Sequence, residues 1–126
     1  MTRTNCDLIL DNAYLRCRSR FFDGRNETWQ LEQMFRKGRT DPGIQARMLE
    51  GGYAGDWVIY FRWDEARGAW IAEQDTEVRG RKVVERYTLT PAADRNSFLF
   101  TEETRLAAPG SPWQEVWRWT ATRAGP

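Results

Sequence analysis

Three glutamates occupy matching positions in successive segments that alternate between polar and apolar residues. Glu85, Glu102 and Glu115 are each in phase with neighbouring aromatic residues, and Gln74 has the same phase in the segment before them. Side chains alternate between the two faces of a strand, so these residues are expected to form one row on one face. Like charges placed directly opposite destabilise a sheet, and burial raises the pKa of a carboxyl group. The row could therefore supply a general acid and base.

The charge of this row could also be accommodated without acid–base chemistry. An arginine, an amine-bearing ligand or a hard cation could offset it. The row could also lie at the wetted rim of an open sheet, or be neutralised by arginines from a loop or from the first strands. No residue in the row besides the carboxylates is a strong metal ligand, so we expect no metal site.

Aromatic residues are expected to fill the rest of this face. The chain has 13% aromatic residues, including seven Trp. Aromatic side chains are large enough to line a cavity for an apolar ligand, although an aromatic stripe is more often core. The predicted ligand-binding residues are Trp57, Phe61, Trp63, Trp70, Gln74, Tyr87, Phe98, Phe100, Trp113, Trp117 and Trp119.

Short alternating segments separated by turn residues must position these side chains. They predict an all-β fold, an antiparallel up-and-down meander of about eight strands that closes or nearly closes into a barrel, as one domain over residues 1–126. Segment 44–50 is the weakest, because it could also form a short helix. The predicted strands are 13–22, 28–36, 44–50, 56–64, 69–78, 82–90, 97–105 and 113–122.

The predicted registers agree with one another across the hairpins. Loops at 65–68, 79–80 and 91–96 and a final loop before residue 113 each place apolar residues on one face. In the first half, Leu15, Cys17, Ser19 and Phe21 are predicted to match Trp29, Leu31, Gln33 and Phe35. In the second half the predicted pairs are Trp63–Trp70, Phe61–Ala72, Ile59–Gln74, Gln74–Glu85, Ala72–Tyr87, Leu89–Phe98, Tyr87–Phe100, Glu85–Glu102, Glu102–Glu115, Phe100–Trp117 and Phe98–Trp119. Trp57 and Trp113 are expected at the mouth.

Composition argues against several partners. The net charge of +1 gives no broad electrostatic case for nucleic acid or an anionic membrane, and the chain has no His. No nucleotide, metal or cofactor motif is present, so we expect no cofactor. Cys6 and Cys17 form no CxxC pair and follow no secretory signal, which favours reduced thiols and a cytoplasmic protein.

Three segments resemble a known family. The stretches Asp64-Glu-Ala-Arg-Gly-Ala-Trp70, Ser97-Phe-Leu-Phe-Thr-Glu-Glu103 and Trp113-Gln-Glu-Val-Trp-Arg-Trp119, with Arg123 after them, are similar to the C-terminal hairpins of small bacterial lipocalin-like (calycin-like) proteins. The resemblance covers about two thirds of the chain and implies an antiparallel barrel around a small, mostly apolar molecule. The chain departs from the pattern, because it lacks the Gly-x-Trp near the start of a typical lipocalin.

These observations support three hypotheses. The first is a barrel that binds a small apolar or aromatic molecule, with the polar end held by Gln74, Glu85, Glu102 and Glu115. The second is an enzyme of the same fold, a cyclase, isomerase or dehydratase, in which two of the glutamates act as acid and base and Tyr87 donates a hydrogen bond. The third is a module that forms a homodimer through a sheet edge or face.

Overall fold

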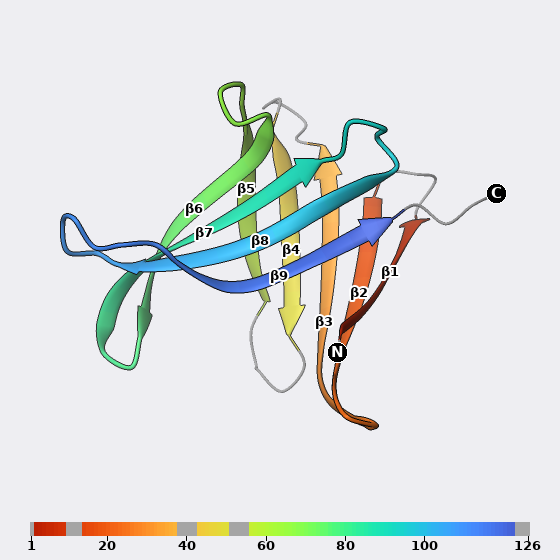
Figure 1. The fold of residues 1–126 in the computed structure, drawn as a ribbon, viewed down its shortest axis with the longest axis horizontal. Helices are drawn as coiled ribbons and strands as arrows, with labels where there is room; N and C mark the ends of the chain where they lie inside the picture. The colour runs from red at the N-terminus through yellow and green to blue at the C-terminus, as the bar shows by residue number, and fades with distance from the viewer. Residues whose placement is uncertain (1, 10–13, 38–42, 51–55, 123–126) are drawn as a thin grey trace. The chain divides into compact units, whose positions relative to one another are not determined.

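The computed structural model describes residues 2–9, 14–37, 43–50 and 56–122, and all regular structure in them is antiparallel β-sheet (Figure 1). None of these residues belongs to a helix long and apolar enough to cross a membrane. Each strand pairs with its neighbour in sequence. The strands are β1 (Thr2–Ile9), β2 (Tyr14–Asp23), β3 (Asn26–Lys37), β4 (Ile44–Glu50), β5 (Asp56–Asp64), β6 (Ala69–Val78), β7 (Arg81–Pro91), β8 (Ser97–Leu106) and β9 (Gln114–Thr122).

All eight predicted strands are present, with small differences at their ends, and segment 44–50 is a strand. The sequence prediction missed β1, so the described chain has nine strands. Thr2–Ile9 reads Thr-Arg-Thr-Asn-Cys-Asp-Leu-Ile, which lacks the aromatic and apolar alternation of the other segments. Its pairing with β2 therefore outweighs a weak local preference.

The chain divides into two compact units, Met1–Phe61 and Arg62–Pro126. Strand β5 contributes to both, because its earlier residues pair with β4 whereas Arg62–Asp64 pair with β6. The predicted pair Trp63–Trp70 is confirmed. The predicted pairs Phe61–Ala72 and Ile59–Gln74 follow the same register but are not formed, because the ladder between β5 and β6 ends at Arg62 and Ile71.

In the first unit, the predicted register of β2 and β3 is confirmed. Leu15, Cys17, Ser19 and Phe21 pair with Phe35, Gln33, Leu31 and Trp29. Side chains alternate between the two faces of a strand, and the buried residues of β2 and β3 all belong to the face that the sequence predicted. Among the residues of this unit whose side chains are described, the buried ones are Cys17, Ser19, Leu31, Gln33, Phe35, Ile59 and Phe61.

The two cysteines correct the expectation of free thiols. Cys6 of β1 lies directly opposite Cys17 of β2, and the two form a disulfide. The described residues contain no free cysteine. Disulfides persist mainly in oxidising compartments, so the cysteines no longer support a cytoplasmic location.

In the second unit, the predicted register of β6 and β7 is confirmed, with Gln74 opposite Glu85 and Ala72 opposite Tyr87. The turn between them fixes this register, because Arg79 and Gly80 both have positive φ, 50° and 74°. Two adjacent residues of positive φ form the tight hairpin turn whose twist matches that of the strands, and glycine adopts that φ without steric cost.

The next two registers differ from the prediction by two residues. Tyr87 lies opposite Glu102 and Leu89 opposite Phe100, so the predicted pairs Glu85–Glu102, Tyr87–Phe100 and Leu89–Phe98 are wrong. The cause is a shorter loop, in which the Ala92 N–H donates to the Ser97 carbonyl at 2.8 Å, so that the ladder continues past Pro91. A shift of two residues keeps every side chain on its face.

A β-bulge in β9 accounts for the largest difference. Phe100 pairs with Trp119 and Glu102 with Trp117, but the register shifts after Glu102, so that Glu103 pairs with Glu115. The predicted pairs Phe100–Trp117 and Phe98–Trp119 are wrong by the same two residues as before, whereas Glu102–Glu115 is wrong because the bulge places Glu115 opposite Glu103. Val116 is the extra residue, and an extra residue moves the side chains before it to the other face.

Candidate functional site

One face of β6–β9, here named the apolar face, carries most of the predicted ligand-binding residues. Its buried members include Tyr87, which is 4% exposed, Phe100, which is 0% exposed, and Trp119, which is 5% exposed. Its residues are Trp70, Ala72 and Gln74 of β6, Glu85, Tyr87 and Leu89 of β7, Phe98, Phe100 and Glu102 of β8, and Trp117, Trp119 and Ala121 of β9.

Four aromatic rings of β8 and β9 pack together on the apolar face. The Phe100 ring stacks on Trp119, with centroids 5.1 Å apart and an interplanar angle of 20°. Trp117 meets the edge of Phe100 at 5.7 Å, and Phe98 meets the edge of Trp119 at 5.4 Å. The indole N–H of Trp119 is buried and has no hydrogen-bond partner in the described part of the chain, which is unusual for a buried donor.

Next to these rings lies a polar cluster formed by Gln74, Glu85 and Tyr87. One oxygen of Glu85, Oε2, accepts a hydrogen bond from Gln74 Nε2 at 2.7 Å and another from the Tyr87 hydroxyl at 2.8 Å. Gln74 Nε2 also lies 3.3 Å from the Tyr87 oxygen. The register produces this cluster, because Gln74 is opposite Glu85 and Tyr87 follows two residues later on the same face.

Burial raises the pKa of the Tyr87 hydroxyl far above its usual range, and the charges of Glu102 and Glu85 raise it further. Tyr87 lies directly opposite Glu102, so the hydroxyl is between two carboxylate-bearing positions. It therefore keeps its proton at neutral pH and acts as a hydrogen-bond donor. The Tyr87 ring contacts Phe100 at 6.1 Å, which joins the polar cluster to the aromatic rings.

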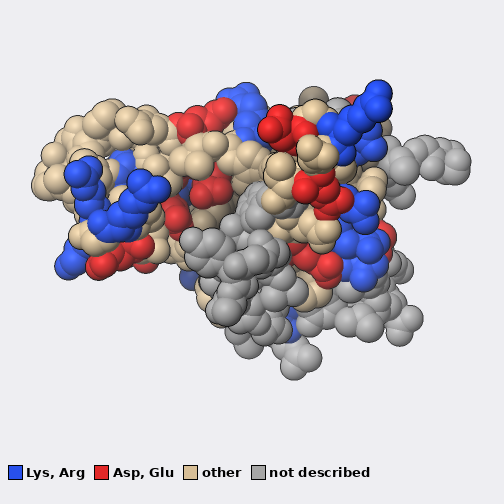
Figure 2. All heavy atoms as spheres, turned by 90° about the horizontal axis from the view of Figure 1, so that it is seen from below, with Lys and Arg blue, Asp and Glu red and all other residues tan. Residues whose placement is uncertain are grey.

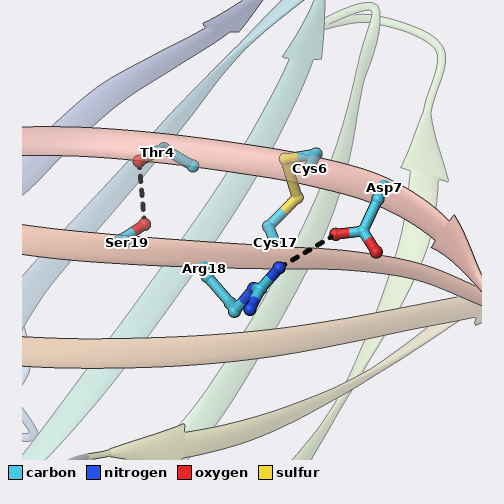
Figure 3. The surroundings of a disulfide bond; sticks show 6 residues. All are labelled: Thr4, Cys6, Asp7, Cys17, Arg18 and Ser19. Carbon is cyan, nitrogen blue, oxygen red and sulfur yellow. Dashed lines mark hydrogen bonds and ion pairs between the residues drawn. A yellow bond between two sulfur atoms is a disulfide. The ribbon is translucent and has the colours of Figure 1, made fainter.

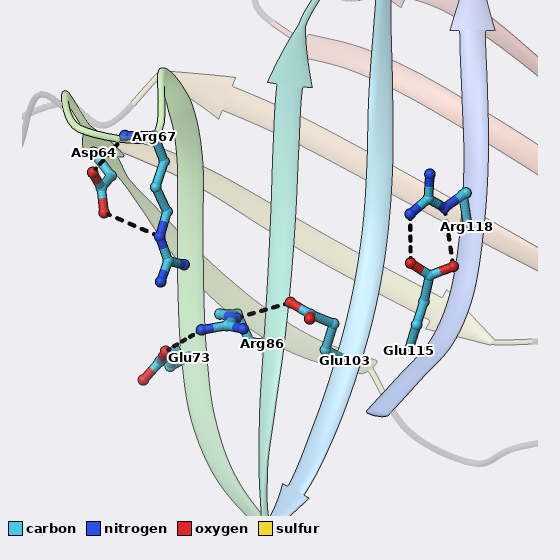
Figure 4. A network of polar contacts seen from close by, with 7 residues as sticks. All are labelled: Asp64, Arg67, Glu73, Arg86, Glu103, Glu115 and Arg118. Atoms are coloured by element: carbon cyan, nitrogen blue, oxygen red, sulfur yellow. Dashed lines mark hydrogen bonds and ion pairs between the residues drawn. The ribbon is translucent and has the colours of Figure 1, made fainter. Parts of the chain in front are cut away.

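The opposite face of the same strands, here named the charged face, holds Glu115, which the sequence had placed beside Glu102. Glu115 accepts hydrogen bonds from Arg118 Nε at 2.9 Å and from Arg118 Nη2 at 2.6 Å (Figure 4). This bidentate contact lowers the pKa of Glu115. The prediction that Glu115 shares a row with Glu85 and Glu102 is therefore wrong, because of the bulge at Val116.

Trp113 also lies against the charged face and not at a mouth. Its ring is 3.9 Å from the guanidinium carbon of Arg86 and 5.0 Å from that of Arg105. Arg86 Nε donates to Glu103 at 2.9 Å, and Arg86 Nη1 lies 3.9 Å from Glu73 (Figure 4). Sequence reasoning missed this arginine, although the registers now place Glu73, Arg86 and Glu103 side by side on adjacent strands.

The remaining predicted residues lie on β5. Phe61 is buried in the first unit, where its ring is 6.4 Å from Phe35. Trp63 belongs to the second unit, is 39% exposed and contacts the edge of Trp70 at 5.4 Å. Trp57 pairs with Met48 through the backbone, and its side chain lies outside the described residues. The structure therefore does not group Phe61 with the residues of the apolar face.

Charge on the molecular surface is mixed. Acidic and basic side chains are interspersed over the face seen in Figure 2, in keeping with 19 Lys and Arg against 18 Asp and Glu in the chain. Within the described ranges, no three His, Cys, Asp or Glu side chains are grouped in a way that could hold a metal ion.

Similarity to known proteins adds no function to this site. No protein-family model, no curated protein and no solved structure matches the chain. The resemblance to lipocalin-like proteins therefore stays a prediction, and the contacts of Gln74, Glu85 and Tyr87 carry the functional inference.

Proposed function

We propose that the apolar face of β6–β9 binds a small, largely apolar or aromatic molecule and holds its polar end at Gln74, Glu85, Tyr87 and Glu102. One observation carries the proposal. Glu85 lies half-buried beside aromatic rings, and its hydrogen-bond donors, Gln74 and Tyr87, are both neutral. In the described part of the chain Glu85 makes no ion pair. A partly buried carboxylate without a cation favours a ligand that supplies further hydrogen bonds or charge.

The geometry limits the chemistry of the ligand. Both donors of the cluster, Gln74 Nε2 and the Tyr87 hydroxyl, already point to Glu85 Oε2, so the cluster offers a ligand acceptors, namely the Glu85 carboxylate and the Gln74 amide oxygen. The polar end of the ligand is therefore a donor such as an amine or a hydroxyl. The apolar part packs against Phe100, Trp117 and Trp119, and an acceptor near Trp119 would satisfy its buried indole N–H.

A closed, lipocalin-like barrel of one domain is the architecture we propose for holding this ligand. Antiparallel pairing between consecutive strands is the feature that supports it. In a closed meander with an odd number of strands, the first and last strands pair in parallel. Interstrand contacts between β1 and β9 in solution NMR spectra would test closure, and their absence in the ligand-bound protein would contradict it.

The test of ligand binding uses freshly purified protein. Native mass spectrometry should show a co-purified small molecule, or a library of aromatic amines and alcohols should quench tryptophan fluorescence. Glu85→Gln should weaken binding about tenfold or more, because a hydrogen bond to a charged group contributes roughly 1.5–3 kcal/mol. Glu115→Gln is the matched control and should leave binding unchanged. Equal effects of the two variants, or no binding across the library, would contradict the proposal.

A proton-transfer enzyme of the same fold is a second candidate, favoured by the neutral Tyr87 hydroxyl next to two glutamate positions. In it, Glu85 and Glu102 would be the acid and base of a cyclisation, isomerisation or dehydration, and Glu115 takes no part. Turnover of a bound ligand that is lost in both Glu85→Gln and Glu102→Gln would support the enzyme. Binding without any turnover would support the binding protein.

A homodimer built on a sheet face is the remaining candidate. Val58 and Tyr60 of β5 are 38% and 64% exposed, and exposed apolar residues are typical of contact surfaces. The same native mass spectra report the oligomeric state, and Tyr60→Ser should dissociate a dimer formed through this strand. A monomer at micromolar concentration would contradict the dimer.

A further inference from the structure

The disulfide joins an edge strand to the body of the first sheet. Strand β1 is at the end of the strand order, so β2 is its single hydrogen-bonded neighbour in the described sheet. Cys6 lies directly opposite Cys17, with the Cα atoms 4.1 Å apart (Figure 3). The two ends of the bond differ in environment, because Cys17 is 0% exposed whereas Cys6 is exposed at the sheet edge.

The other side-chain contacts between β1 and β2 are polar or partly exposed. Thr4 Oγ1 and Ser19 Oγ lie 2.8 Å apart, and Arg16 Nη2 donates to Asp7 Oδ2 at 2.6 Å. The Arg3 guanidinium lies 5.3 Å from the centre of the Phe22 ring. Individual contacts of these kinds contribute little in water. The covalent bond is therefore the strongest side-chain link described between β1 and β2.

We propose that the Cys6–Cys17 disulfide is a reducible latch, that is, a cross-link that holds β1 on β2 until the bond is reduced. A dithiol reductant reaches the exposed Cys6, and exposed disulfides are the ones most open to exchange. A thiolate of the reductant attacks the Cys6 sulfur, a mixed disulfide forms, and Cys17 leaves as a thiolate that takes up a proton. The second thiol of the reductant then attacks the mixed disulfide, closes its own disulfide and releases Cys6. Two electrons and two protons pass to the protein.

Reduction then loosens β1 while the rest of the sheet stays paired. The edge of β2 is left with unpaired backbone N–H and C=O groups, which are open to another extended segment. This inference does not use the residues of the apolar face, since the bond and its contacts lie in the first unit, and it takes β1 as an edge strand, as described, and not as the partner of β9 in a closed barrel.

Hydrogen–deuterium exchange of the oxidised and the dithiothreitol-reduced protein, without denaturant, tests the latch. We expect both cysteines to become alkylatable within minutes, and the amides of Thr2–Ile9 to exchange at least tenfold faster after reduction. The amides of β7 and β8 should change less than twofold. The double variant Cys6→Ser/Cys17→Ser should show the fast exchange without reductant.

Thr4→Val is the matched control, because it removes the contact to Ser19 and leaves the disulfide in place. It should keep the slow exchange of β1 until reductant is added. Three results would overturn the latch: a disulfide that resists reduction in the folded protein, unchanged exchange in Thr2–Ile9 after reduction, or an equal increase throughout β1, β7 and β8. The last result would identify the bond as a staple for the whole fold.

Discussion

The two faces of β6–β9 surround glutamate side chains with different partners. On the charged face, Glu103 and Glu115 each accept hydrogen bonds from an arginine, Arg86 and Arg118. On the apolar face, Glu85 accepts from Gln74 and Tyr87, which carry no charge. The charged face is thus internally neutralised, whereas the apolar face keeps acceptor capacity beside aromatic rings. The comparison shows that a glutamate bonded to an arginine has a structural role here, whereas a glutamate bonded only to neutral donors is a candidate for ligand binding.

The largest expected effect is on the apolar face. Phe100 is 0% exposed and contacts Tyr87, Trp117 and Trp119, so Phe100→Ala should lower the free energy of unfolding by about 3–5 kcal/mol. Thr101→Ala, one residue further along on the charged face, is the matched control and should cost less than about 1 kcal/mol. Urea denaturation measures both. Similar losses would mean that the two faces contribute equally to the core.

Removal of the Arg86 side chain should destabilise the charged face. The Arg86 side chain is 11% exposed, bonds to Glu103 and lies over Trp113, so Arg86→Ala should cost about 2 kcal/mol in the free energy of unfolding. Arg86→Lys keeps the charge but loses the planar stacking, and should fall between the wild type and Arg86→Ala. Arg105→Ala, which loses the ring contact alone, should cost less. A neutral effect of Arg86→Ala would contradict internal neutralisation of this face.

Alkaline pH should lower the stability of the apolar face through the ionisation of Tyr87. Its pKa is raised in the folded protein, so the folded state holds the proton more tightly than the unfolded state. The associated stability is present below the ordinary tyrosine pKa of about 10 and declines above it, by at most about 1.4 kcal/mol per pH unit. Tyr87→Phe should cost about 1 kcal/mol at neutral pH and lack this part of the alkaline decline.

Thermal unfolding of the wild type and of Tyr87→Phe between pH 8 and pH 11 is the measurement for this prediction. Parallel pH profiles for the two proteins would show that Tyr87 is not the group responsible.

The smallest effect is expected for the exposed pair on the charged face. The Arg118 contact lowers the pKa of Glu115, so its contribution is present at neutral pH and is lost as the pH falls through the lowered value. Exposed ion pairs contribute little, and Glu115→Gln should change the denaturation midpoint less than any variant above. The same variant should leave ligand binding intact. A loss of binding would place Glu115 in the site after all.

Strand positions followed from the sequence more reliably than registers did. The turn at Arg79 and Gly80 has a fixed geometry, and its register was predicted correctly. The loop at 91–96 was predicted two residues too long, because Pro91 pairs with Phe98 and the Ala92 N–H donates to the Ser97 carbonyl at the end of β7. The error did not change which side chains were predicted to share a face, since a shift of two residues keeps each side chain on its face.

The candidate site was predicted in part for the same reason. Gln74, Glu85, Tyr87 and Glu102 were placed on one face, and the structure places them there. Glu115 and Trp113 were misplaced, because alternation alone carries no signal for the bulge at Val116. Strand β1 was missed because its attachment to β2 includes a disulfide and polar contacts in place of an aromatic pattern.

The bulge also gives β9 one position at which its length can change, because Val116 has no partner in the ladder. Substitution of Val116, which is 58% exposed, changes one side chain at the surface. Deletion of the same residue would remove the bulge and leave Glu115 opposite Glu103, on the charged face beside Arg118. One codon lost in frame at this position would therefore keep the other side chains of β9 on their present faces, so a sequence one residue shorter here would present the same binding face.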